Sequence, residues 1–288
     1  MGLLEPVFSI YFVLLLIRAV IPDTGQMTFN QPYRLVIKIT RPVVDFLSRV
    51  FSRQNITPAP VLGMLLIIFL QGLLYMGRSG SGTGVFFLGL SRWNFATTMP
   101  FWGMGQSIVY YLILLYRLYA FLLIIALISP LESASDQVSR LAKRIIQPVE
   151  NVGRGRWPSL FILFISFTFL LTGLWKIYQV IGWLEPERLI PVKAGLDGIA
   201  IIIPLSWVIV FLIILRVVFS WFTRTRSSGG PLTWLGLFTE PFLRPFRRLN
   251  LAIGTIDLTP LVAILAVVIA GRVLSVIIGS AYFALPGA

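Results

Sequence analysis

The sequence predicts an all-α membrane protein: a polytopic helix bundle of about six transmembrane helices, with amphipathic helices on the cytoplasmic side. Hydrophobic residues make up 57% of the 288 residues and charged residues 12%, about half the charged share of a soluble domain, and the mean hydropathy is +0.88. Charge-poor stretches approach the length of about 20 residues that crosses the hydrocarbon. Positive charge gathers in alternate connections between them, as in membrane proteins of fixed orientation.

The expected spans follow from the gaps between charged residues. They are residues 6–21, 58–77, 105–129, 158–181, 198–222 and 260–284. No charged residue lies between Arg53 and Arg78, or between Arg156 and Lys176. Arg18 interrupts the first stretch, so this helix crosses only if the arginine is buried in protein or reaches the headgroups.

The distribution of Lys and Arg among the connections predicts the orientation. Residues 22–57, 130–157 and 223–259 hold five each, whereas the two alternate connections hold two each, so the balance is fifteen to four. Under the positive-inside rule the three basic connections are cytoplasmic and both termini lie on the other side. The net charge of +13 therefore reflects topology, and we expect no nucleic-acid partner.

The chain has no Cys and no His. Disulfides, thiolate or imidazole metal ligands, His-ligated haem, Cys nucleophiles and His general bases are therefore excluded. We expect a protein without catalytic residues, cofactor or metal site.

The basic connections reveal an internal repeat of helix, basic connection and helix. Arg18 and Pro42 are 24 residues apart, and Arg216 and Pro241 are 25 apart, while the middle copy, around Pro148, is shortened. The expected repeats are residues 1–104, 105–197 and 198–288. Because they share one orientation, they would pack around an axis along the membrane normal, which disfavours alternating access.

Two of the basic connections have helical amphipathic spacing. Residues 33–53 alternate apolar and basic faces, which predicts a helix on the cytoplasmic surface, kinked at Pro42 or divided there into two helices. Residues 239–249 repeat the design with Arg244, Arg247 and Arg248. Near anionic lipid each arginine contributes about 1 kcal/mol, so we expect these three to bind anionic phospholipid or an acidic partner. The alternative is a topology signal only.

Four arginines lie inside the expected spans: Arg18, Arg117, Arg216 and Arg272. A central arginine costs about 2.5 to 3.5 kcal/mol on insertion scales, so each should face the bundle, snorkel, or meet helix C-terminal carbonyls. Snorkelling fits Arg18 and Arg216, whereas Arg117 and Arg272 lie deeper, where an anion or lipid-headgroup site is the alternative. The expected spans contain no Asp or Glu, which weakens a cation-transporter interpretation.

Two acidic residues accompany the third basic connection. Asp257 precedes Pro260, and we expect it to accept hydrogen bonds from the first-turn amides of the last helix, with binding as the alternative. Glu240, before Pro241, lies within a turn of Arg244. We expect either a local ion pair worth under about 1 kcal/mol or a contact with the arginines of another repeat.

The strings TEPFLRPFRRL and GTIDLTPLVAIL resemble the signature of the YggT/YlmG family of small integral membrane proteins. The resemblance covers about residues 216–273 and includes Glu240, Pro241, Arg247, Asp257 and Pro260. In the first repeat, the string TRP, which ends at Pro42, corresponds to TEP, and NITP, which ends at Pro58, corresponds to DLTP. The carboxylates of Glu240 and Asp257 are therefore replaced by Arg41 and Asn55. Most members have one or two units, so three would be an expansion.

The resemblance implies a multi-pass protein of the bacterial inner membrane. Relatives have been linked to osmotic and potassium tolerance, cell division, plastid nucleoid distribution and plastid cytochrome assembly. We expect a non-enzymatic accessory subunit or assembly factor that contacts the lipid membrane and other integral membrane subunits. The alternative is an ion or small-solute channel or transporter linked to osmotic or potassium homeostasis.

Overall fold

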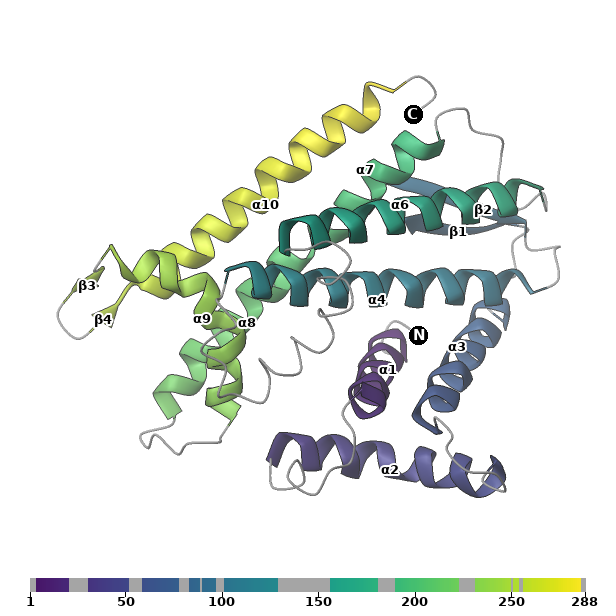
Figure 1. Cartoon of the computed structure of the whole chain (residues 1–288), viewed down its shortest axis with the longest axis horizontal. Helices are drawn as coiled ribbons and strands as arrows, with labels where there is room; N and C mark the ends of the chain where they lie inside the picture. The colour runs from purple at the N-terminus through teal and green to yellow at the C-terminus, as the bar shows by residue number, and fades with distance from the viewer. Residues whose placement is uncertain are drawn as a thin grey trace. The chain divides into compact units, whose positions relative to one another are not determined.

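The computed structural model consists mainly of helices (Figure 1). It describes residues 4–20, 31–51, 59–77, 83–88, 90–96, 101–128, 156–180, 190–222, 231–249, 251–253 and 256–285. The chain divides into two compact units. The N-terminal unit comprises Met1–Gly84 and Phe95–Leu114, and the C-terminal unit comprises Val85–Asn94 and Leu115–Ala288.

The N-terminal unit is built from three helices and the first part of a fourth. These helices are α1 (Leu4–Val20), α2 (Gln31–Phe51), α3 (Ala59–Gly77) and α4 (Trp102–Ile128), of which α4 continues into the other unit. Helices α1 and α3 pack together, and α2 contacts both and runs crosswise beneath them in Figure 1. Gly63 permits this packing, because a Cβ there would lie 3.0 Å from Cδ1 of the buried Leu15.

Helices α3 and α4 meet through small residues and a polar contact. A Cβ on Gly103 would collide with the carbonyl oxygen of Gly72, so only glycine allows this backbone approach, as is common between membrane helices. The buried Gln71 donates through Nε2 to the hydroxyl of Tyr75 at 2.8 Å and accepts from the hydroxyl of Tyr111. The amide is therefore bonded on both sides within the protein.

The C-terminal unit continues α4 and, in its described residues, adds five helices. These are α6 (Arg156–Val180), α7 (Ile190–Ile202), α8 (Leu205–Phe222), α9 (Pro231–Arg247) and α10 (Thr259–Phe283). A turn at Ile203 and Pro204 separates α7 from α8, yet both lie in one apolar stretch, Pro191–Ser220. The span expected at residues 198–222 therefore begins earlier than the sequence suggested.

Two short hairpins complete the described structure. Strands β1 (Thr83–Leu88) and β2 (Ser91–Ala96) pair, and β3 (Ala252–Ile253) pairs antiparallel with β4 (Ile256–Asp257). The second hairpin leads directly into α10. It departs from the all-α prediction only locally.

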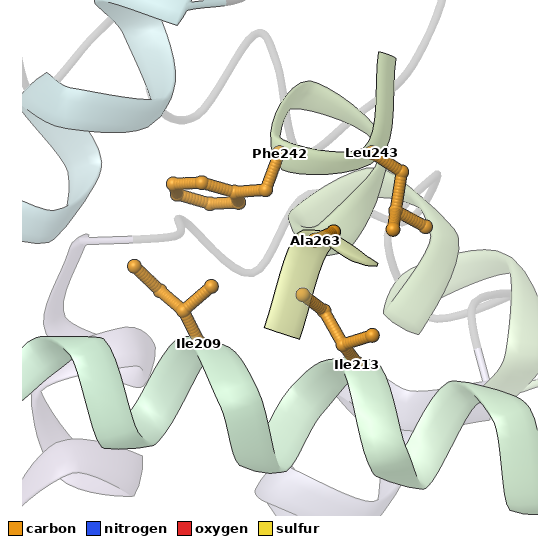
Figure 2. Packing of buried hydrophobic residues seen from close by; sticks show 5 residues of the cluster. All are labelled: Ile209, Ile213, Phe242, Leu243 and Ala263. Carbon is orange, nitrogen blue, oxygen red and sulfur yellow. The ribbon is translucent and has the colours of Figure 1, made fainter. Parts of the chain in front are cut away.

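Helices α8, α9 and α10 share a small apolar core (Figure 2). Ile209 and Ile213 project from α8 towards Phe242 and Leu243 of α9 and Ala263 of α10. Four of these side chains are bulky and Ala263 is small, which lets α10 approach closely. The core fixes the amphipathic helix α9 onto two apolar helices.

Among the residues that the structure describes, four helical segments are long and apolar enough to cross a membrane. They are Ala59–Gly77, Trp102–Leu122, Pro191–Ser220 and Thr259–Phe283. The other two expected spans also form helices, but α1 has 17 residues and the apolar part described in α6 is Phe161–Ile177. The structure thus supports a helical membrane protein, and the count of six spans is not confirmed.

The amphipathic helices are continuous through their prolines, and α9 is longer than expected. Helix α2 passes through Pro42, so of the two alternatives predicted there, a kink or a division into two helices, the division is wrong. Helix α9 begins eight residues before Thr239 and passes through Pro241 and Pro245. Tertiary contacts of the apolar face compensate for the hydrogen bonds that proline removes. The middle basic connection, residues 130–157, lies mostly outside the described residues.

Candidate functional site

A cluster of charged side chains joins α8 to α9. Both terminal nitrogens of Arg216 lie 3.0 Å from Oε2 of Glu240, and Nη1 also donates to the hydroxyl of Thr239 at 2.8 Å. Oε1 of Glu240 lies 2.6 Å from Nη1 of Arg247. One carboxylate therefore bridges two arginines, and we call these four residues the α8–α9 cluster.

Thr239 orients the cluster from a buried position. Its hydroxyl donates to the Leu235 carbonyl four residues earlier at 2.6 Å, which leaves the oxygen lone pair for Arg216. Only 1% of Thr239 is exposed, whereas the side chains of Glu240 and Arg247 are 39% and 49% exposed. The ion pairs therefore contribute at most about 1 kcal/mol each, and the buried hydroxyl fixes the geometry.

Asp257 adds a second negative charge nearby. Hydrogen bonds from Thr259 lower the pKa of Asp257 below its usual value, and the charges of Arg247 and Arg216 lower it further. Asp257 is thus ionised at neutral pH, so two carboxylates balance two guanidinium groups. This balance favours a structural role for Arg216 and Arg247.

Asp257 makes one hydrogen bond of the kind expected of it at the start of α10. Its Oδ1 accepts a hydrogen bond from the Thr259 amide at 2.9 Å, the first amide of α10, while Pro260 lies in the first turn. The β3–β4 pairing of Ala252 with Asp257 holds the carboxylate in place. Pro241, by contrast, is buried inside α9 and caps no helix.

Glu240 forms ion pairs, but with different arginines from those predicted. Among the described residues its ion pairs are with Arg247 and Arg216, and none is with Arg244 or with an arginine of another repeat. The prediction missed Arg216 because the two residues are 24 positions apart and on different helices. Arg244 and Arg248 are exposed, and the described residues provide them with no ion pair.

Helices α1 and α2 form a matching contact in the N-terminal unit. Arg18 donates through Nη1 to the hydroxyl of Thr40 at 3.0 Å, and Thr40 donates to the Val36 carbonyl at 2.7 Å. The next residue is Arg41, which lies 3.2 Å from Asp45 on the same helix. We call Arg18, Thr40, Arg41 and Asp45 the α1–α2 site.

The remaining span arginines differ in their surroundings. Arg117 donates through Nε to the carbonyl of Ile201 at 2.9 Å, next to the end of α7, which agrees with one of the three surroundings expected for the span arginines. Arg272 is exposed, and the described residues give it no hydrogen bond or ion pair. Arg18 and Arg216 bond to threonines of amphipathic helices, which goes beyond the snorkelling that we expected.

Helix α7 contains two buried charged residues that the sequence did not predict. Lys193 and Asp197 are 2% and 0% exposed, and both lie inside the stretch Pro191–Ser220, so the expectation of spans without Asp or Glu is wrong. Asp197 accepts a hydrogen bond from the Leu90 amide at 2.8 Å, and Lys193 lies over the ring of Tyr282. Their spacing of four residues was the available signal, since it places both on one helix face.

The geometry offers ion pairs and helix contacts. In the part of the chain that the structure describes, no three His, Cys, Asp or Glu side chains gather so that they could hold a metal ion. The α8–α9 cluster, the Asp257 cap and the apolar helices around them define the class: a helical integral membrane domain with an amphipathic helix locked between two apolar ones.

A CCB3/YggT family domain is found at residues 196–278. This match supports the resemblance to the YggT family over the segment from α7 to α10, and together with the apolar helices it supports a membrane location. The matched segment contains all four residues of the α8–α9 cluster as well as Asp257 and Pro260. No curated protein and no solved structure matches the chain.

Proposed function

We propose that this protein is a non-enzymatic accessory subunit or assembly factor of a larger membrane complex. It would cross a bacterial inner membrane six times in three YggT-like repeats, with the basic connections in the cytoplasm and both termini outside. The family domain and the apolar helices support the membrane location. The fifteen-to-four distribution of basic residues supports the orientation.

The observation that carries the proposal is the exposed arginine at the centre of α10. Arg272 is the fourteenth of its 25 residues, so it lies about 20 Å along the helix at a rise of 1.5 Å per residue. Around it Ile269, Val273 and Ile277 are exposed, and only 11% of the apolar stretch of α10 is buried, against 39% in each of the other three spans. A lipid-facing arginine at this depth is costly, so a partner helix with a carboxylate or free carbonyl would stabilise it.

Affinity capture in mild detergent tests the role of Arg272. Arg272→Leu should insert normally but lose most of the co-purifying membrane subunits, whereas the control Arg272→Lys should keep them because it retains the charge. Capture of the same subunits by the native chain, Arg272→Leu and Arg272→Lys would contradict the proposal.

A second surface for a partner is the end of α9. Arg244 and Arg248 are exposed, whereas Arg247 is engaged with Glu240. We therefore narrow the proposed contact with anionic phospholipid or an acidic partner to the first two. Arg244→Gln with Arg248→Gln removes about 2 kcal/mol of surface attraction, at roughly 1 per residue. Undiminished liposome binding and partner recovery would leave this helix end as a topology signal only.

Cysteine labelling tests the orientation in intact cells. The chain has no Cys, so single cysteines at Ser227 and Ala288 give unambiguous signals. A membrane-impermeant reagent should label position 288 and spare position 227. Labelling at position 227 from outside would contradict the proposed topology.

The alternative function is an ion or small-solute channel or transporter. Two of the polar residues that could line such a path are internally bonded, Gln71 with two tyrosines and Thr172 with the Thr168 carbonyl at 2.7 Å, whereas the buried hydroxyl of Thr168 has no hydrogen-bond partner among the described residues. These contacts favour helix packing. Potassium flux in proteoliposomes above that of empty vesicles would support the alternative instead.

A further inference from the structure

The α1–α2 site and the α8–α9 cluster have the same hydrogen-bonding plan. In each, an arginine of an apolar helix donates through Nη1 to a buried threonine, at 3.0 Å for Arg18 and 2.8 Å for Arg216. In each, the threonine hydroxyl donates to the carbonyl four residues earlier. The exposed fractions of Thr40 and Thr239 are 0% and 1%.

The packing around the two contacts is also equivalent. Leu15 and Ile213, each three residues before the arginine, are both 0% exposed. Val44 and Leu243, each four residues after the threonine, are also buried. The two sites therefore present the arginine to its amphipathic helix in the same local frame.

The charge that faces the arginine is what differs. Glu240 follows Thr239 and neutralises Arg216, whereas Arg41 follows Thr40. The Arg41 side chain is 72% exposed and pairs with Asp45. Glu5 and Asp45 are the only acidic residues described in the N-terminal unit, and no carboxylate there is found in an ion pair with Arg18.

A guanidinium group in a membrane protein needs a counter-charge, because burying an unpaired charge costs several kcal/mol. The planar donor pairs of arginine match a phosphate as well as a carboxylate. Around the α1–α2 site, α2 exposes the cations Lys38 and Arg41, which attract anionic lipid.

The same helix also offers apolar contacts. Leu35, Ile39 and Phe46 are 59%, 42% and 63% exposed, and the Ile39 carbonyl accepts a hydrogen bond from Tyr11 of α1. Exposed apolar side chains beside an arginine that has no ion pair with a described carboxylate suit an amphiphile with an anionic head and acyl chains. A small soluble anion would leave this apolar surface unused.

We infer that Arg18, positioned by Thr40, binds the phosphate of an anionic phospholipid at the position that the Glu240 carboxylate occupies beside Arg216. The lipid completes the α1–α2 site in the way that Glu240 completes the α8–α9 cluster. This binding does not depend on the assembly role proposed above.

Native mass spectrometry of the full chain, titrated with phosphatidylglycerol in detergent, tests this site. Arg41→Glu supplies a carboxylate where Glu240 has one and should displace the lipid. Lys38→Glu is the matched control. It makes the same charge change on an exposed residue of the same helix, but residue 38 is not adjacent to Thr40 in the sequence. We expect Arg41→Glu to bind phosphatidylglycerol about tenfold more weakly than Lys38→Glu does, the equivalent of one charge-assisted hydrogen bond.

Two further arms identify the ligand class. Phosphatidylcholine should be retained less than phosphatidylglycerol, and an excess of inorganic phosphate should not release bound lipid. Equal binding to Arg41→Glu and Lys38→Glu would overturn the site. Release by inorganic phosphate, or equal retention of both lipids, would overturn its assignment to an anionic phospholipid.

Discussion

The contact between α1 and α2 and the contact between α8 and α9 use the same pair of residue types but differ in charge. Arg18 with Thr40 and Arg216 with Thr239 each tie an amphipathic helix to an apolar one. Only the second pair includes a carboxylate from the neighbouring position. A neutral hydroxyl held by the helix backbone thus suffices to position a membrane arginine, and the ionic part of the contact is free to change.

The family domain covers the α8–α9 cluster, which is the contact that contains a carboxylate. Residues 196–278 include Arg216, Glu240 and Arg247, whereas the α1–α2 site lies outside this match. The loss of the carboxylate at Arg41 is therefore accompanied by divergence from the family signature. If the two regions are repeats, both have kept the arginine and the threonine, and they differ in the group that neutralises the arginine.

Glu240→Arg should produce the largest effect of the variants that break this comparison. It removes two ion pairs and places a third cation beside Arg216 and Arg247, so the free energy of unfolding should fall by about 2 kcal/mol. A single cysteine at Ile213, which is 0% exposed, reports opening through its rate of thiol labelling.

The reverse exchange in the N-terminal unit is the control. Arg41→Glu should not increase labelling of a cysteine at Leu15, which is also 0% exposed. Equal destabilisation by Glu240→Arg and Arg41→Glu would show that charge has no distinct role in the two contacts.

Thr40→Val and Thr239→Val should have intermediate effects of unequal size. The Thr40 variant deprives Arg18 of the hydrogen-bond acceptor that it has among the described residues, at a cost of about 1.5 kcal/mol. The Thr239 variant should cost about 1 kcal/mol, because Arg216 keeps Glu240. Labelling of the same two cysteines measures both, and a larger loss at Thr239 would contradict this ranking.

Asp257→Ala should have a smaller effect that depends on pH. Because the folded pKa of Asp257 is lowered, its stabilisation is complete above the ordinary pKa of about 4 and is lost as pH falls through the lower folded value. Tryptophan fluorescence during SDS titration should therefore show a difference from the native chain at pH 7 that shrinks below pH 4. Asp257→Asn, which keeps a hydrogen-bond acceptor, should lose less.

Asp45→Asn should have the smallest effect. Its pair with Arg41 joins adjacent turns of one helix, and the two side chains are 47% and 72% exposed, so we expect a change of about 0.3 kcal/mol or less. A loss as large as that of Glu240→Gln in the same SDS titration would mean that the two carboxylates have similar roles.

Much of the fold could be predicted because it depends on local pattern. Apolar stretches gave the positions of the spanning helices, amphipathic spacing gave α2 and the end of α9, and the Asp257 cap followed from a short polar residue two positions before a helix start. Predicting these features requires only the residues that are near each position in the sequence. The continuity of α2 through Pro42 did not follow, because tertiary packing decides whether a proline breaks a helix.

The partners of the charged residues could not be predicted in the same way. Arg216 meets Glu240 across 24 positions, and the sequence alone does not give the distance between two helices. Asp197 was assigned outside the membrane because a charge ordinarily ends an apolar stretch, yet its Leu90 contact allows complete burial. Charged residues are therefore poor markers of span boundaries where the fold supplies a partner.

The central claim is that position 41 faces Arg18 as Glu240 faces Arg216. A double-mutant cycle between positions 18 and 41, in the Arg41→Glu background and in lipid-free detergent, measures this most directly. We predict a favourable coupling of about 1 kcal/mol, equal within error to that of the cycle between Arg216 and Glu240. Zero coupling between positions 18 and 41, with clear coupling between Arg216 and Glu240, would contradict the claim.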